Sequence, residues 1–208
     1  MSWLRTLPLL VSVLGLGCFS NTVQLETDPD PGDGSGNDST SDTMDGTGDT
    51  TVSDTGMPMG PQTYLMAYNS SWQPGLPFQA VVTATPGSGT VDLTLQWLSL
   101  DIGSTTAPRQ PVGDVYAYAG VPVDAATGTF YWDTGIILIP GAANPITGAD
   151  VVASIQLNAV PAGTPAYCGA AGGTVLMPVE LSLDGSSHGM NVISDVGNLP
   201  IEFFVACP

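Results

Sequence analysis

The feature that most constrains the fold is an alternation of apolar and polar side chains that recurs beyond residue 60. In residues 91–97 one face would carry Val91, Leu93, Leu95 and Trp97. Successive side chains of a β-strand point to opposite faces, so a period of two predicts a strand with one buried face. After Trp97 the apolar positions shift to Leu98 and Leu100, which predicts a bulge or a sheet edge.

The same period predicts a second strand over residues 175–183, with Val175, Met177, Val179, Leu181 and Leu183 on its inner face. Further strands are predicted at 63–68, 78–85, 114–119, 129–133, 136–139, 151–159, 190–194 and 201–206. Turn signals separate them, and no window has a helical period. We therefore expect an all-β domain over 61–208, an antiparallel meander that forms a barrel or a β-sandwich; the short loops favour the barrel.

The N-terminus has the pattern of an export signal. Arg5 precedes an apolar run at 7–16, and Gly17 and Cys18 follow it. About ten apolar residues are too few to cross a bilayer that requires about 20, so residues 1–17 are predicted to be a cleaved signal peptide. Over about 20 residues the chain resembles a bacterial lipoprotein precursor, with Gly17 and Cys18 matching best. Gly15 and Gly17 also fit the small-x-small pattern of ordinary secretion, so a secreted or periplasmic protein is the alternative.

The resemblance implies that Cys18 is acylated and becomes the first mature residue, a membrane anchor in the bacterial cell envelope. Phe19, in place of an Asp, favours the outer membrane. With Cys18 assigned to lipid, Cys168 and Cys207 remain and can form a disulfide in an oxidising compartment; two buried free thiols are the alternative. Two distant Cys and a single His lack the paired spacing of zinc sites, and no metal or other cofactor is expected.

Residues 18–60 differ from the rest in composition. Of the 34 residues from 27 to 60, 26 are Asp, Thr, Gly or Ser, which predicts a disordered acidic tether. Asp28, Asp30 and Asp33 do not have the spacing of an EF-hand loop. After Cys18 the chain has 19 carboxylates against Arg109 alone, which excludes nucleic-acid binding. Arg109 is predicted to lie in a solvated loop; the alternative is a role as the cation that meets an anionic ligand.

Three patterns in the sequence are candidates for catalysis or metal binding. The segment 185–189 matches the nucleophile-elbow motif, with Ser187 at its centre and His188 beside it. That motif requires a helix after the serine, whereas the following segment is predicted to be a strand. A hairpin turn is therefore the preferred interpretation, and a hydrolase is the alternative. Soft-metal ligands are present in His188, Met190, Met177 and Met66, although methionine usually fills cores. Glycoside hydrolysis requires a carboxylate pair, for which Glu180, Asp184 and Glu202 are candidates, but solvated strand faces explain them better.

Aromatic residues are the remaining indication of a binding surface. Tyr116 and Tyr118 would share one face of a strand whose other face has Val115 and Ala117, and residues 130–132 would present aromatics to both faces. A domain with two apolar layers is favoured over an exposed aromatic strip. The sequence thus predicts a non-catalytic surface binding or structural module, with a protein or carbohydrate as its partner; a small-ligand or glycan-binding β-barrel is the alternative.

Overall fold

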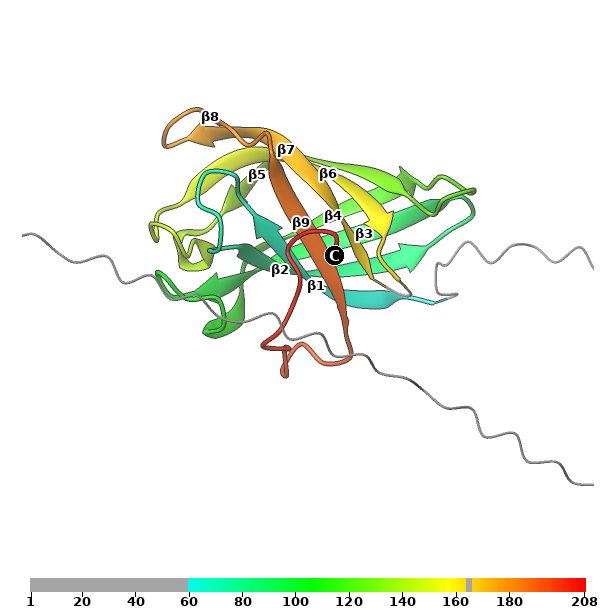
Figure 1. The fold of residues 1–208 in the computed structure, drawn as a ribbon, viewed down its shortest axis with the longest axis horizontal. Helices are drawn as coiled ribbons and strands as arrows, with labels where there is room; N and C mark the ends of the chain where they lie inside the picture. The colour runs from blue at the N-terminus through cyan, green and yellow to red at the C-terminus, as the bar shows by residue number, and fades with distance from the viewer. Residues whose placement is uncertain (1–59, 164–165) are drawn as a thin grey trace, which may run out of the picture. The chain divides into compact units, whose positions relative to one another are not determined.

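A computed structural model describes residues 60–163 and 166–208, which form an antiparallel sheet curled into a nearly closed barrel (Figure 1). The strands are β1 (Gln62–Asn69), β2 (Phe78–Pro86), β3 (Thr90–Leu100), β4 (Pro108–Pro122), β5 (Phe130–Ile139), β6 (Val151–Pro161), β7 (Tyr167–Met177), β8 (Leu181–Ser182) and β9 (Ser186–Ile193). Their order is β4-β3-β2-β1-β9-β7-β6-β5, with β8 paired to β7. The all-β prediction is confirmed, and of the two predicted architectures the sheet forms the barrel and not the β-sandwich.

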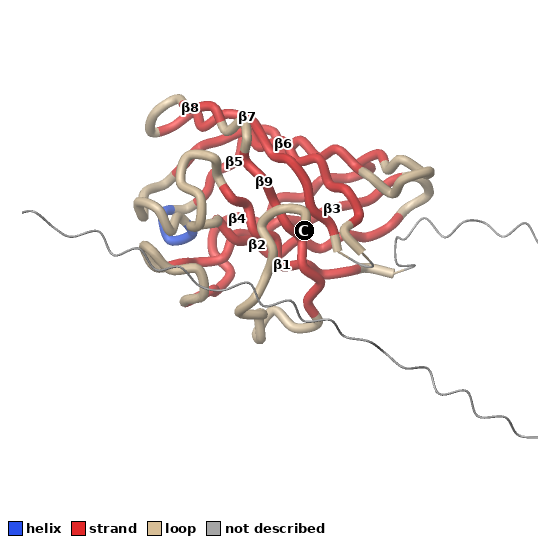
Figure 2. Tube along the Cα trace, viewed as in Figure 1, coloured by secondary structure: helices blue, strands red, loops and turns tan. Residues whose placement is uncertain are grey.

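Strands and loops account for nearly all of the described chain, and a single short 3-10 turn, η1 (Gly141–Ala143), is the helical element within it (Figure 2). The described part contains no helix of the length and apolarity that crossing a bilayer requires. The predicted signal peptide, the acylation site Cys18 and the acidic tether lie outside the described residues, apart from Gly60.

The barrel closes along a seam between β4 and β5, where the ladder of backbone hydrogen bonds is interrupted. Val123 and Phe130 form a β-bridge at one end of the seam. In its middle the hydroxyl of Tyr116 accepts a hydrogen bond from the Leu138 amide (2.9 Å) and donates one to the Leu138 carbonyl (3.0 Å). Near the other end Gly113 has a positive φ of 71°, and a Cβ there would lie 2.6 Å from the ring of Pro140. A single side chain thus makes hydrogen bonds to the backbone across a part of the seam where β4 and β5 have no ladder pairing.

Inward-facing side chains of all the long strands fill the barrel. The face predicted from the alternation in 91–97 is confirmed, since Val91, Leu93, Leu95 and Trp97 are all buried. The register of β3 against β4 shifts between Gln96 and Trp97 and again between Leu98 and Leu100, in agreement with the bulge that the change of phase predicts. Leu98, on the outer face, belongs to a separate small cluster.

Two predicted strands are wrong. The segment 175–183 is not one strand, because β7 ends at Met177 and the chain turns back at Pro178 to pair β8 with β7. Pro178 has no amide hydrogen to continue the ladder. Met177 is therefore the last residue of the strand, and its side chain is 60% exposed instead of lying in the core. The segment 201–206 also forms no strand. The predicted strands at 129–133 and 136–139 are instead one strand, β5, with a register irregularity between Asp133 and Ile136.

Residues 199–207 form a strap across the outer wall. A disulfide joins Cys207 to Cys168 in β7, with Cα atoms 5.0 Å apart, which confirms the predicted pairing over two free thiols. The carbonyl of Val205 accepts a hydrogen bond from Ser187, and the backbone of Phe204 exchanges two with the side chain of Asn191. The strap covers an outer apolar cluster whose buried members are Leu65, Leu98 and Ile193, with Leu199 and Phe203 packed on it.

The barrel has two distinct ends. β1 begins at Gln62 at one end and finishes at Asn69 at the other, which we call the pocket end. The connections at the pocket end are 70–77, 101–107, 140–150 and 178–185. Loops carried on a rigid wall are the usual location of binding residues. The start of β1 at Gln62 therefore lies at the end opposite these loops.

Candidate functional site

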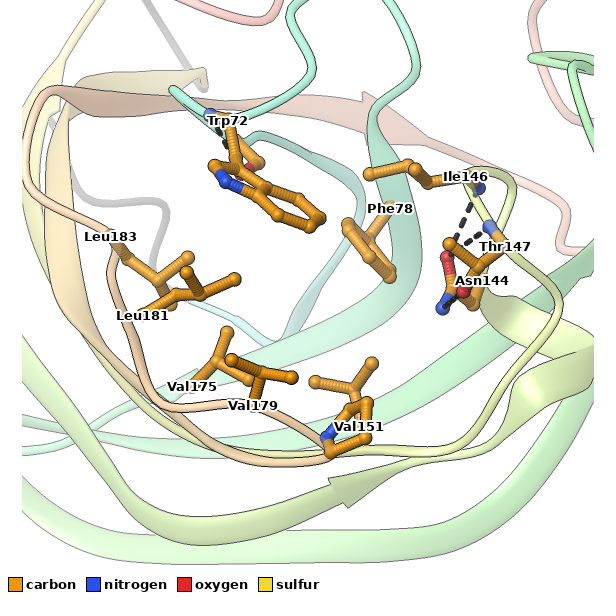
Figure 3. Close-up of a pocket in the computed structure, with 12 residues that line it drawn as sticks. Trp72, Phe78, Asn144, Ile146, Thr147, Val151, Val175, Val179, Leu181 and Leu183 are labelled. Carbon is orange, nitrogen blue, oxygen red and sulfur yellow. Dashed lines mark hydrogen bonds between the residues drawn. The ribbon is translucent and has the colours of Figure 1, made fainter.

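An apolar pocket of about 120 Å³ lies at the pocket end of the barrel (Figure 3). It is lined by Ser70, Trp72, Phe78, Asn144, Ile146, Thr147, Val151, Val175, Pro178, Val179, Leu181 and Leu183. Figure 3 shows the labelled side chains converging on one central space from all sides. The lining therefore combines three connections of this end, 70–77, 140–150 and 178–185, with the ends of β2, β6 and β7.

The polar groups of the lining are already hydrogen-bonded to the protein. The side-chain amide of Asn144 donates to Thr147 Oγ1 and to the Ala149 carbonyl, both at 2.8 Å. Its carbonyl oxygen accepts from the amides of Ile146 and Thr147. Ser70 Oγ accepts from the Trp72 amide. Asn144 thus closes its own loop instead of presenting free donors or acceptors, and the pocket offers mainly hydrocarbon surface.

Two apolar side chains of the rim stand in solvent. Trp72 is 60% exposed and Val179 is 61% exposed, although both line the pocket. Trp72 is held on a loop that bends at Gly75, where φ is 90° and the amide donates to Asn69 Oδ1. The sequence interpretation did not single out Trp72. A tryptophan surrounded by Asn, Ser, Pro and Gly was the signal that could have identified an aromatic residue on a loop.

The nucleophile-elbow match is not a nucleophile–base pair. Ser187 faces outward, where its hydroxyl donates to the Val205 carbonyl of the strap, whereas His188 is fully buried inside the barrel. Consecutive residues of a strand point to opposite faces, so β9 separates the two side chains. A turn is present, but it lies earlier than predicted: the Ser186 amide donates to the Leu183 carbonyl across it. The motif from Ser186 onward belongs to strand β9.

His188 lies in the apolar interior and not in the pocket lining. Among the described residues neither ring nitrogen has a hydrogen-bond partner. Burial lowers the pKa of His188 to about 4, and contacts with the backbone of Gly169 and Ala170 that do not meet hydrogen-bond geometry oppose this shift in part. The imidazole is therefore neutral at physiological pH.

The candidate metal and carboxylate residues are dispersed. Met66 and Met190 face each other across β1 and β9 in the core, whereas Met177 is exposed at the end of β7. Glu180 lies between β7 and β8, Asp184 follows β8, and Glu202 lies in the strap. No group of three His, Cys, Asp or Glu side chains placed to hold a metal ion occurs in residues 60–163 and 166–208.

Arg109 is not in a solvated loop, which corrects the prediction. It is only 6% exposed, and its guanidinium donates to the carbonyls of Pro200 (2.6 Å) and Thr105 (2.8 Å). The guanidinium also lies 5.2 Å from the ring centroid of Phe203. Burial lowers the pKa of Arg109 below its ordinary value. Arg109 therefore fastens the strap instead of meeting an anionic ligand.

The aromatic residues mostly belong to the inner layer. Tyr118 and Trp132 stack edge to face at 5.2 Å, and Tyr116 packs beside them against the core. Of residues 130–132 only Tyr131 is exposed. The sequence favours two apolar layers over an exposed aromatic strip. The aromatic side chains lie on the inner layer, whereas Val115 is exposed on the outer face.

Comparison with known proteins adds no relative: no family model, no curated protein and no solved structure matches this chain. The candidate site therefore rests on the geometry of the pocket.

Proposed function

We propose that this chain is a non-catalytic binding module whose site is the apolar pocket, held at the bacterial cell envelope by an acyl chain on Cys18 and by the acidic tether. The observation that carries the proposal is a pocket at one end of the barrel, lined mainly by hydrocarbon and by Asn144, whose side-chain groups are already paired. Concave, largely apolar sites of this kind are typical of small-ligand binding.

The size of the pocket limits what it can hold. A cavity of about 150 Å³ accommodates benzene in another protein. A pocket of about 120 Å³ therefore fits a hydrocarbon group of about six carbons. Burial of each methylene contributes about 0.8 kcal/mol, so such a group binds without any new hydrogen bond.

Of the two alternatives for a small ligand, the pocket favours an apolar group over a glycan. Sugar hydroxyls lose hydrogen bonds to water when they are buried, and unmatched polar groups are costly. Asn144 has already committed its side-chain donors and its acceptor to the protein. A carbohydrate would find few partners at this site.

The proposal is tested with toluene, a neutral probe whose six-carbon ring matches this size, on protein carrying Cys18→Ser so that no detergent is needed. Binding is followed by the fluorescence of Trp72 and by methyl chemical shifts of Val179 and Leu183. The variant Val179→Asp places a carboxylate in the lining and should weaken binding about tenfold or more.

The matched control is Ile136→Asp, which introduces the same charge at an exposed position of β5 outside the pocket. It should bind toluene like the parent protein. If toluene shifts no resonance of the lining, or if both variants bind it equally, the pocket is not the binding site and the proposal is wrong.

A further inference from the structure

The lining of the pocket changes from buried to exposed between its floor and its opening. Four lining residues are at most 7% exposed and form the floor: Ser70, Phe78, Asn144 and Leu183. Four others are exposed and mark the opening: Trp72, Thr147, Pro178 and Val179. Three of these four side chains are apolar. A ligand that extends out of the pocket therefore passes between hydrocarbon surfaces.

Both sides of this opening are tied to strands of the barrel. Trp72 follows Ser71, whose amide donates to the hydroxyl oxygen of Ser186, the first residue of β9, at 3.0 Å. Val179 lies between β7 and β8, which pair with each other. In the view of Figure 3, Trp72 and Val179 lie on opposite sides of the pocket. An apolar surface that is fixed before binding loses little freedom when a ligand covers it.

A ligand that only fills the floor would leave the opening uncovered. A hydrocarbon group of about six carbons occupies a volume of about 120 Å³. The side chains of Trp72 and Val179 would then remain 60% and 61% exposed. Exposed apolar side chains that are continuous with an apolar site mark surface that a ligand can bury. The opening therefore favours a ligand that has further hydrocarbon beyond the first six carbons.

A peptide is the other occupant to consider, because one of its apolar side chains could enter the pocket. Its backbone would bring N–H and C=O groups to the opening, and each of them requires a hydrogen-bond partner. The side-chain donors and acceptor of Asn144 are already used, and apart from Thr147 the opening is apolar. A hydrocarbon chain requires no such partners, so the lining favours a chain over a peptide.

On the basis of the proposed function, we infer that the ligand is an unbranched alkyl or acyl chain of more than six carbons, taken up from solution. The end of the chain lies against Phe78 and Leu183 on the floor. The methylenes that follow lie on Trp72 and Val179, and the head group stays in water beyond them. The pocket therefore selects the length of the chain and not the head group.

The inference is tested with four alcohols that share one head group and differ in chain length: 1-butanol, 1-hexanol, 1-octanol and 1-decanol. Their affinities for the Cys18→Ser protein are measured by chemical-shift titration of the methyl groups of Val175 and Leu183. Up to six carbons, each methylene should strengthen binding about fourfold, as expected for full burial. Beyond six carbons the opening covers one side of the chain, so each methylene should add about twofold. 1-Decanol should then bind about 16-fold tighter than 1-hexanol.

Variants locate the source of this gain. Trp72→Ser should reduce the ratio of the decanol and hexanol affinities to about fourfold or less, and Val179→Ser, on the other side of the opening, should also reduce it. The ratio is taken within each variant, so a loss of affinity common to both alcohols cancels. Tyr131→Ser removes an aromatic side chain that is 54% exposed on β5 outside the pocket and serves as the control. It should keep the ratio of the parent protein.

The outcomes separate the inference from the proposed function. If affinity stops rising at six carbons, or if both Trp72→Ser and Val179→Ser keep the parent ratio, the chain does not follow the opening and the inference is wrong while the pocket stands. Co-sedimentation of the Cys18→Ser protein with phosphatidylcholine vesicles, lost in Trp72→Ser, would show that the opening enters a bilayer and would also overturn the inference. Only the absence of binding of both toluene and 1-hexanol overturns the proposed function.

Discussion

At the scale of single residues, two buried polar side chains have roles that their positions in the sequence conceal. Arg109 has a positive φ of 58°, in the left-handed region that costs a non-glycine residue about 1 kcal/mol. This conformation aims its guanidinium at the carbonyls of Thr105 and Pro200. The hydrogen bonds that fasten the strap thus offset the backbone strain.

Replacement of Arg109 separates these two effects. Arg109→Ala removes two charge-assisted hydrogen bonds and keeps the strain, so it should lower the free energy of unfolding by about 2 to 3 kcal/mol. Arg109→Gly removes the same bonds but relieves the strain and should unfold less readily than Arg109→Ala, by up to about 1 kcal/mol. Urea unfolding compares them. Equal stability of both variants and the parent would show that the strap does not depend on Arg109.

His188 gives the fold a dependence on pH. Its folded pKa of about 4 lies below its ordinary value of 6.5, so between these values the unfolded chain binds a proton that the folded chain does not. Stability from this group is therefore present above pH 6.5 and is lost as the pH falls towards 4, by up to about 3 kcal/mol. His188→Leu should flatten the pH dependence in this window, measured by urea unfolding at pH 7, 5.5 and 4.5. An unchanged slope in the variant would contradict the assignment.

At the scale of elements, the β4–β5 seam depends on one hydroxyl. Tyr116→Phe leaves the amide and carbonyl of Leu138 without their protein partner and should cost about 1 kcal/mol, since water can reach this partly exposed position. The amide of Leu138 should then exchange with solvent faster. Tyr131→Phe, an exposed neighbour on β5, is the control and should change neither property. A Leu138 amide that exchanges equally slowly in both variants would refute the bridging role.

The alternation of side chains was sufficient to predict the strands that wrap the core, because burial on one face imposes a period of two. It failed where the sequence remained apolar but the backbone could not continue. Pro178 interrupts the run 175–183, and its missing amide was a visible warning. In the segment 201–206, Phe203 packs on the cluster of Leu65 and Leu98, a partner that only long-range contacts bring together, and no ladder pairing follows. The pocket could not be predicted for the same reason, since its lining comes from three connections and from the ends of three strands.

At the scale of the whole molecule, the proposed anchor predicts where the protein is found. Cys18→Ala should move the chain from the membrane fraction to the aqueous fraction of fractionated cells, because it removes the sulfur to which the proposed acyl anchor is attached. Intact mass of the membrane-bound form should show an acylated Cys18. Membrane recovery of the Cys18→Ala variant would contradict the anchor.

The start of β1 and the pocket lie at opposite ends of the barrel. The eight residues of β1 extend up to about 26 Å at about 3.3 Å per residue. This is about three times the distance over which physiological salt screens a charge, roughly 8 Å. A charge at the start of β1 would therefore contribute almost nothing to the potential at the pocket. The potential at the pocket is then set by the loops of its own end and should not change when charges are introduced at the start of β1.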